Sequence, residues 1–290
     1  MAAPRAERPG DGAAPAGDNR PRAPFVSRGW IPRLQLLEIE DQRWCPAFAR
    51  DALTDFLRSL MDWFAPYRVA GPILTRALRT SGDTEIVDLC SGGGGPWLDL
   101  VPRMSPAGGN AFHVRLTDRY PNHAAFARLR DASGGIIDGE PEPVDATVVP
   151  ARLSGFRTLF TALHHFSPDA AHAILADAVR SRRGIAAFEL TRRSPVALVG
   201  MLFLPILLLL CTPFIRPFRW ERLVWTYLVP IVPLIVWFDA TVSCLRTYTR
   251  NELCDLVADL HDGYDWEIGA VWAPPLVSRV TYILGLPRRS

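Results

Sequence analysis

Four consecutive glycines form the segment of this chain that is best suited, by residue type and spacing, to bind a ligand. Gly92 to Gly95 follow closely on an apolar run, Ile86 to Leu89, which carries the acid Asp88. A strand, a glycine turn and a helix in this order can cradle a nucleotide, because a backbone without Cβ atoms turns tightly and approaches a ligand closely. The segment predicts a nucleotide-binding loop, and a glycine-rich surface loop is the alternative.

Two common types of nucleotide loop can be tested against this segment. A phosphate-binding P-loop needs a lysine followed by serine or threonine after its glycines, and the chain contains no lysine. A dinucleotide loop needs a small residue three positions after its second glycine, but Trp97 stands there when Gly92 and Gly94 are counted. The first type is therefore excluded and the second is disfavoured.

The segment instead resembles motif I of the class I S-adenosylmethionine-dependent methyltransferases, in which apolar residues precede Asp/Glu-x-Gly-x-Gly-x-Gly. Asp88, Cys90, Gly92 and Gly94 match this pattern, with Cys90 standing where the family usually has its first glycine. The resemblance implies methyltransferase activity and S-adenosylmethionine as the cofactor, held by these four residues.

Two acids further along the chain are candidates for the remaining cofactor contacts. Asp118 follows an apolar run, 112–117, and an acid about 20 residues beyond a nucleotide loop can accept hydrogen bonds from both ribose hydroxyls. The resemblance gives Asp118 the same role on the adenosine moiety, with a turn or helix-capping role as the alternative. It also implies an acid near the third strand that meets the adenine amino group, and Asp145, in the predicted strand 144–149, is the candidate.

A pair of histidines, His164 and His165, follows the apolar run 156–163. Open α/β sheets bind ligands outside the carboxyl ends of their strands, so the pair is predicted to lie at the mouth of the site. Histidine can take the proton of a hydroxyl near neutral pH, and His165 is our candidate general base, against a packing or capping role. Consecutive side chains do not converge, so no metal site is predicted. Glu189 is a second candidate, unless it forms an ion pair with an arginine that follows it.

The elements that must position these residues alternate between strands and helices. Five parallel strands followed by an antiparallel pair are how the methyltransferase sheet closes, so we expect an α/β fold with a doubly wound seven-stranded sheet of methyltransferase type. Strands are predicted at 86–89, 112–117, 144–149, 156–163, 184–190, 264–272 and 277–284, and helices at about 46–65, 72–78, 96–104, 123–130, 168–180 and 249–260.

The composition divides the chain into four parts. Residues 1–26 are rich in Ala, Pro, Gly and Arg and are predicted to be a disordered tail. Residues 27–80 are predicted to form an N-terminal helical cover, and residues 81–193 together with 246–290 the methyltransferase domain. Residues 194–245 interrupt that domain as an apolar helical hairpin.

The hairpin contains two long apolar runs. Val196 to Ile215 has no charged residue, and at 1.5 Å per residue in a helix it can cross a hydrocarbon core of about 30 Å. Leu223 to Phe238 is shorter and marginal. We predict contact with a membrane, against buried helices of a soluble core. Arginines on both flanks favour a catalytic domain on the cytoplasmic face, but arginines between the runs and several prolines leave a spanning and a re-entrant hairpin both open.

The overall composition excludes few classes. The net charge is +2 and the arginines are scattered, so no nucleic-acid partner is expected. The five cysteines show neither close pairs nor metal-ligand spacing and are expected to be reduced thiols. No secretory signal is predicted at the N-terminus.

These predictions combine into one function and one alternative. The chain is expected to be an S-adenosylmethionine-dependent methyltransferase that acts at the membrane surface on a hydrophobic small molecule or lipid, such as a quinone or polyprenyl compound. The alternative is a membrane-attached adaptor with a non-catalytic methyltransferase-like domain, and a nicotinamide oxidoreductase is a distant third.

Overall fold

The computed structural model describes residues 25–27, 29–40, 42, 44–104, 112–274 and 278–288. Most of the predicted tail, 1–26, lies outside the described residues. At its end Phe25 packs edge-on against Tyr248, with ring centroids 5.9 Å apart. This last part of the predicted tail therefore packs on the fold.

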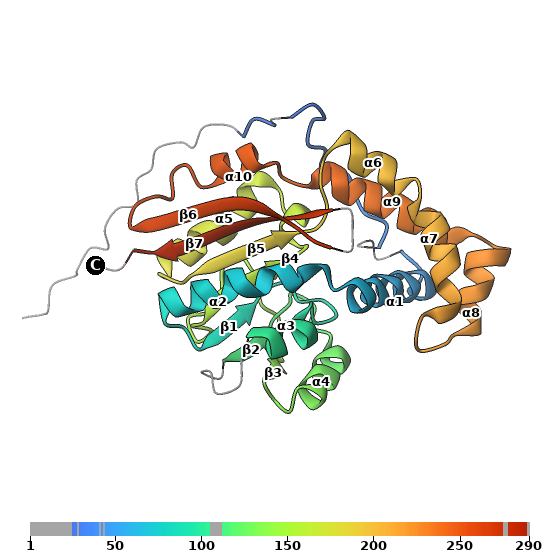
Figure 1. Ribbon diagram of the computed structural model, residues 1–290, viewed down its shortest axis with the longest axis horizontal. Helices are drawn as coiled ribbons and strands as arrows, with labels where there is room; N and C mark the ends of the chain where they lie inside the picture. Colours follow the sequence, from blue (N-terminus) through green and yellow to red (C-terminus); the bar gives the residue numbers. More distant parts are fainter. Residues whose placement is uncertain are drawn as a thin grey trace, which may run out of the picture.

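A seven-stranded sheet forms the centre of the fold, in the order β3-β2-β1-β4-β5-β7-β6 (Figure 1). The first five strands are parallel, and β7 pairs antiparallel with both β5 and β6. This is the sheet of the class I methyltransferase fold, so the predicted fold class is confirmed. The strands are β1 (Glu85–Asp88), β2 (His113–Leu116), β3 (Ile137–Gly139), β4 (Phe156–Phe160), β5 (Ile185–Glu189), β6 (Tyr264–Trp272) and β7 (Arg279–Pro287).

The third strand is not where the sequence predicted it. Residues 144–149 form a turn, and β3 is the three-residue segment Ile137–Gly139 within the predicted loop. The side chain of Asp145 accepts hydrogen bonds from both the backbone N–H and the hydroxyl of Thr147. This local bonding stabilises a turn in place of a strand, and a strand as short as β3 has too few residues to show an alternating pattern.

Helices cover both faces of the sheet. One face carries α2 (Ala70–Ser81), α3 (Trp97–Met104) and α4 (His123–Ala132), and the other carries α5 (Pro168–Arg180) and α10 (Arg250–Leu256). Neighbouring residues of β1, Ile86 and Val87, belong to the two different cores, as expected for a strand buried on both sides. The starts predicted for α5 and α10, near residues 168 and 249, are confirmed. Ser167 caps α5, and Thr249 and Glu252 form a capping box at the start of α10.

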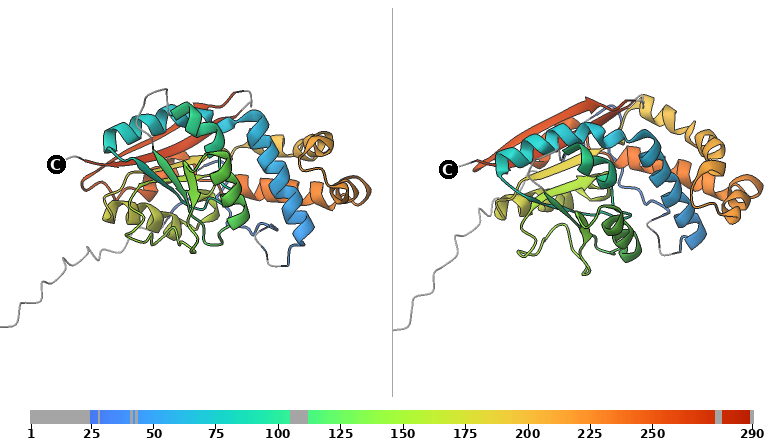
Figure 2. Two further views of the ribbon diagram at one scale, coloured as in Figure 1. Left: turned by 90° about the horizontal axis from the view of Figure 1, so that it is seen from below. Right: turned by 60° about the horizontal axis from the view of Figure 1, so that its bottom comes forward.

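The first helix packs away from the sheet. α1 (Ala47–Phe64) shares a third core with the apolar insert, a cluster that contains Phe56 of α1 and Leu208, Val232 and Val236 of the insert. Both views of Figure 2 show α1 beside the insert helices at one end of the molecule. α1 thus attaches the insert to the rest of the fold.

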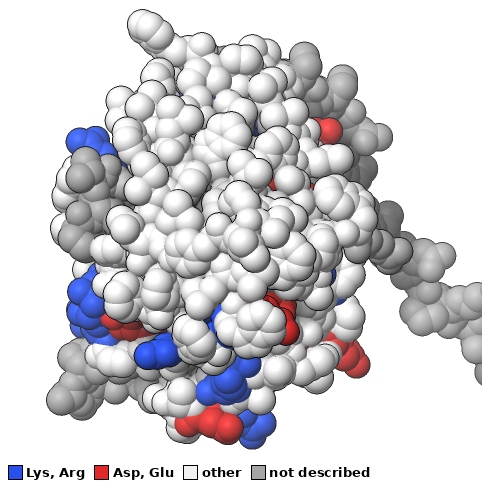
Figure 3. Space-filling view, turned by 90° about the vertical axis from the view of Figure 1, so that its right-hand side faces the viewer, with Lys and Arg blue, Asp and Glu red and all other residues white. Residues whose placement is uncertain are grey.

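The insert lies between β5 and α10 and consists of α6 (Pro195–Met201), α7 (Leu204–Cys211), α8 (Trp220–Leu223) and α9 (Ile231–Arg246). The stretch Pro195–Phe214 is long and apolar enough to cross a membrane, with a mean hydropathy of 2.5 and only 11% of it buried. Trp220–Leu228 and Ile231–Arg246 pass the same test only as a pair bent by 78°. Figure 3 shows a broad surface without charged side chains at this end of the molecule. Length and composition thus allow one span, or two if the bent pair counts as one.

An extended segment before α1, here called the N-terminal strap (residues 29–40), runs across the end of α9. The backbone N–H of Leu34 donates to the carbonyl of Leu245 at 3.1 Å. The N–H groups of Ile39 and Glu40 donate to the two carboxylate oxygens of Asp239 at 2.7 and 2.9 Å. The strap is therefore fixed to the insert.

Candidate functional site

The predicted site residues gather at the carboxyl edge of the parallel strands. The glycine loop follows β1, and the histidine pair follows the adjacent strand β4. The arrow of β5 in Figure 1 shows that this edge faces the end of the molecule where the insert lies. The placement agrees with the rule for open α/β sheets.

The glycine loop has the backbone conformation that its sequence requires. Cys90 has φ +57°, and Gly92, Gly94 and Gly95 also have positive φ, a region that disfavours residues with a Cβ. Cys90 thus adopts the left-handed conformation that the family's usual glycine would reach without strain. A Cβ at Gly94 would lie 1.9 Å from Leu129, whereas a Cβ at Gly92 or Gly93 would meet no atom within 4 Å.

Asp88 lies beneath the loop and is fully buried. Its two carboxylate oxygens accept hydrogen bonds from the hydroxyls of Thr158 on β4, at 2.6 Å, and Ser91 in the loop, at 2.7 Å. Burial raises the pKa of Asp88 from 3.8 to about 6, against the effect of these hydrogen bonds. Asp88, at the end of β1, therefore links the glycine loop to β4.

Asp118 contacts the loop directly. Its Oδ2 accepts the N–H of Gly92 at 2.8 Å, and its Oδ1 accepts the N–H of Tyr120, also at 2.8 Å. Carboxylate oxygens have about four acceptor positions, so the side chain retains the capacity to bind hydroxyl groups beside the loop.

Asp145 lies near these residues although its strand was predicted wrongly. The backbone N–H of Val144 donates to the carbonyl of Asp118 at 2.9 Å. The hydrogen bonds from Thr147 lower the pKa of Asp145, and Arg119 adds to this effect. Desolvation raises the pKa of the Cys90 thiol, and the carboxylates of Asp118, Asp88 and Asp145 raise it further. Cys90 is therefore a neutral thiol surrounded by the three predicted cofactor acids.

The loop and its acids fit the nucleoside part of S-adenosylmethionine. The space above Gly92 and Gly93 is open, which permits a ligand to approach the backbone. Asp118 stands beside this space on the neighbouring strand end, as a ribose-binding acid must.

The two histidines differ in their surroundings. His164 is buried, and its Nδ1 lies 2.7 Å from Glu189 Oε2, while its backbone N–H donates to Glu189 Oε1 at 3.3 Å. Glu189 thus holds the imidazole in place, and among the described residues it pairs with this histidine and not with an arginine. Arg193 pairs instead with Glu252.

His165 is partly exposed and faces the N-terminal strap. Its Nδ1 lies 3.2 Å from Oε2 of Glu38, whose side chain is fully buried. The strap also contacts the backbone of the pair, because Arg33 donates to the carbonyls of His164 and Phe166 and Gln35 donates to the carbonyl of His165. Arg246, at the end of α9, donates to the carbonyls of both histidines.

Glu38 is the residue of this site that sequence reasoning missed. More than a hundred positions separate it from the histidines, and no motif or periodicity links them. The premise that consecutive histidines diverge also fails here: the pair lies in a short helical turn, 163–165, with ring centroids 4.3 Å apart.

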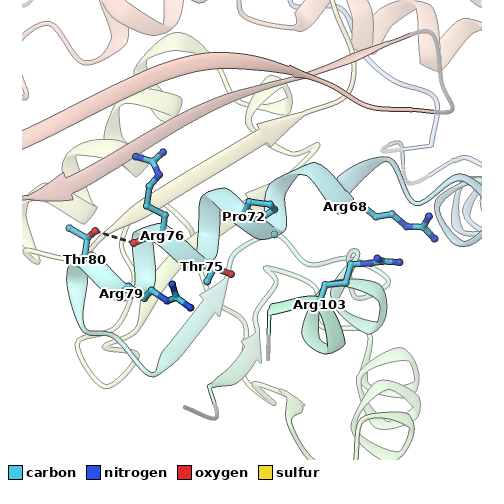
Figure 4. A pocket seen from close by; sticks show the side chains of 8 residues that line it. Arg68, Pro72, Thr75, Arg76, Arg79, Thr80 and Arg103 are labelled. Carbon is cyan, nitrogen blue, oxygen red and sulfur yellow. Dashed lines mark hydrogen bonds between the residues drawn. The ribbon is translucent and has the colours of Figure 1, made fainter. Parts of the chain in front are cut away.

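A separate cavity of about 630 Å³ lies along α2 and α3. Figure 4 shows four arginines around it, Arg68, Arg76, Arg79 and Arg103. Arg68 and Arg103 pair with Asp99, and Arg76 pairs with Glu267. The lining contains none of the predicted site residues.

Comparison with known proteins gives structural matches alone. No family model and no curated protein matches the chain. The mitomycin 7-O-methyltransferase MmcR is 15% identical, with 77% of this chain and 54% of that chain covered and a TM-score of 0.43. The pyocyanin biosynthetic protein PhzM is also 15% identical, with 83% of this chain and 59% of that chain covered and a TM-score of 0.47. The plantazolicin methyltransferase BpumL, solved with SAH, is 10% identical, with 87% of this chain and 94% of that chain covered and a TM-score of 0.48. The chain thus spans only a little over half the length of the first two proteins, and these matches transfer no residue role to it.

Proposed function

We propose that this chain is an S-adenosylmethionine-dependent methyltransferase acting on a hydroxyl group of a hydrophobic small molecule or lipid at a membrane surface. One observation carries the proposal: a glycine loop with its acids and a buried, carboxylate-oriented histidine follow two adjacent strands, β1 and β4, at the same sheet edge. A nucleotide cradle and a proton-handling group side by side are what methyl transfer to a hydroxyl requires.

The cofactor half has distinct tasks for each residue. When bound, S-adenosylmethionine supplies a methyl group whose bond to sulfur breaks as the acceptor oxygen bonds to its carbon, the electron pair remaining on sulfur. Gly92 and Gly94 permit close approach to the backbone, and Asp118 binds the ribose hydroxyls. Asp88 supports the loop from below, and Asp145 stands at the adenine end.

The part of the site that binds the methyl acceptor, here called the acceptor half, is centred on the histidine pair. A hydroxyl that receives the methyl group must lose its proton, and we place this proton loss at His164 and His165. His165 was the sequence-based candidate for this role. Burial and the bond to Glu189 make His164 the better-positioned partner.

The position of the insert supports a hydrophobic acceptor. α9 carries exposed apolar side chains, including Leu234 at 60% exposure, and ends at Arg246, which touches the backbone of both histidines. An acceptor held by the apolar surface of the insert would therefore meet the histidine pair. Arginines before and after the insert favour a catalytic domain on the cytoplasmic face.

A methyl-transfer assay tests the proposed activity. The full-length protein in detergent is incubated with methyl-tritiated S-adenosylmethionine and a total extract of host membrane lipids and quinones, and label is counted in the organic phase. We expect protein-dependent label that His164→Gln reduces by about 10²-fold or more, while His172→Gln, at a partly exposed histidine paired with Asp259, leaves it unchanged. A folded protein that binds the cofactor but transfers no label would support the non-catalytic adaptor.

Vesicle flotation tests the proposed membrane contact separately. The protein is expected to float with vesicles, and the variant Phe203→Glu/Leu210→Glu, changed at two exposed positions of the insert, is expected to remain in the dense fraction. Leu37→Glu, at an equally exposed position of the strap, is the control. Equal flotation of all three proteins would refute the role of the insert.

A further inference from the structure

Two buried atoms at the histidine pair and its neighbour Glu38, each able to accept a hydrogen bond, lack a hydrogen-bond partner within the described part of the chain. They are Oε2 of Glu38 and Nε2 of His164. Because His164 Nδ1 is bonded to the carboxylate of Glu189, that nitrogen carries the proton and Nε2 carries a lone pair. Glu38 Oε2 lies 3.2 Å from His165 Nδ1, but among the described residues it makes no hydrogen bond. Because buried polar atoms are nearly always satisfied, two buried atoms with lone pairs and no hydrogen bond indicate a site for a cation.

His165 supplies a third candidate ligand. The candidate ligand atoms of Glu38, His164 and His165 all lie within 4.8 Å of one another. Zinc binds imidazole nitrogen and carboxylate oxygen at about 2.0–2.2 Å, so small rotations of these three side chains bring the atoms around one ion. The short helical turn that holds the histidines makes this convergence possible.

The surroundings of the three side chains also suit a metal. Metal-bound histidines usually donate their second N–H to a carboxylate, which Glu189 provides for His164. The other oxygen of Glu38, Oε1, accepts the hydroxyl of Ser243 at 2.8 Å and lies 3.5 Å from Arg246 Nη1. One carboxylate oxygen is thus fixed by the protein, and the other faces the histidines.

We propose that Glu38, His164 and His165 bind one divalent transition-metal ion, for which zinc is the best match to two imidazoles and a carboxylate. Three protein ligands leave a coordination position open, as in catalytic zinc sites. Resting on the proposed function, we assign that position to the acceptor hydroxyl. Its oxygen binds the ion, its O–H becomes more acidic, and its proton passes to solvent. In this arrangement the two histidines are ligands and not general bases.

Metal analysis without S-adenosylmethionine tests the site. The full-length protein is stripped with a chelator, dialysed against Zn²⁺ and analysed by mass spectrometry, and Co²⁺ is added as a spectroscopic probe. We expect about one zinc per chain and visible Co²⁺ absorption bands, with affinity lowered at least about tenfold in Glu38→Gln and His164→Gln. Glu38→Gln preserves the shape of the side chain and the bond from Ser243, and near-ultraviolet circular dichroism checks its folding. His172→Gln is the control.

Two results would overturn the metal site. One is a folded wild type that retains neither zinc nor cobalt, and the other is binding that Glu38→Gln leaves unchanged. Methyl transfer that survives complete chelation would assign the histidines to general-base catalysis and leave the proposed function standing. A zinc-loaded protein that transfers no methyl group would retain the metal site and refute the proposed function.

Discussion

The cofactor half and the acceptor half of the site are built in opposite ways. The cofactor half lies almost entirely within one stretch of the chain, from β1 to Asp118 just after β2, in which Asp88 and Asp118 contact the same loop. The acceptor half combines the strap, the turn after β4, the end of β5 and the end of α9. The first depends on local backbone geometry and the second on long-range ion pairs, so mutations should affect them differently.

The largest effect is expected at a buried ion pair next to the acceptor half, between a residue that follows β5 and a residue of α10. Arg193 and Glu252 form a fully buried ion pair, with Arg193 Nη2 at 2.6 Å from Glu252 Oε2. Glu252→Ala leaves a buried arginine without this carboxylate, and we expect the free energy of unfolding to fall by about 3–5 kcal/mol. Urea denaturation in detergent measures it. Asp265→Ala, in an exposed pair with Arg288, should cost at most about 1 kcal/mol. Equal losses of stability in the two variants would show that the buried pair contributes no more than an exposed one.

The next effect concerns the support of the cofactor loop and depends on pH. Because burial raises the pKa of Asp88 to about 6, the folded protein binds its proton more tightly than the unfolded chain. This stabilisation is complete below pH 3.8 and is lost as the pH rises through 6. Wild type should therefore lose about 2 kcal/mol relative to Asp88→Asn between pH 4 and pH 7. A difference that does not vary with pH would contradict this account of Asp88.

A smaller effect is expected in the loop itself. Gly94→Ala places a Cβ against Leu129 at a φ of +112°, and we expect a loss of about 2 kcal/mol in the free energy of unfolding. Gly93→Ala is the matched control, because its Cβ meets nothing within 4 Å and its φ is not positive. Thermal denaturation of both variants compares them. Equal stability would show that the loop adapts and is not preformed.

The smallest effect is expected at Cys90, which stands where the methyltransferase motif usually has a glycine. Cys90→Gly relieves a positive φ of 57° but increases the entropy of the unfolded chain, so stability should change by less than about 1 kcal/mol. Cofactor affinity should stay within about twofold of wild type. Cys90→Val, with a branched Cβ at positive φ, should be clearly less stable. A large loss of affinity in Cys90→Gly would give the thiol a role in binding.

The contrast between the halves also explains what the sequence could predict. Hydrophobic periodicity, glycines and capping residues are local signals, and they located six of the seven strands, the main helices and the loop. The exception, β3, has three residues and was displaced by the turn at Asp145. Glu38 and its approach to His165 depend on the strap binding Asp239 of the insert, a tertiary contact that no local pattern encodes.

Calorimetric titration of S-adenosylmethionine into the detergent-solubilised protein tests the central claim most directly. We expect micromolar binding by wild type, weakening of about 1–3 kcal/mol in Asp118→Ala, and affinity within about twofold of wild type in His164→Ala. Cofactor binding would then depend on the cofactor half of the site and not on the acceptor half. No binding by a folded wild type, or binding indifferent to Asp118→Ala, would contradict the account and favour the membrane adaptor.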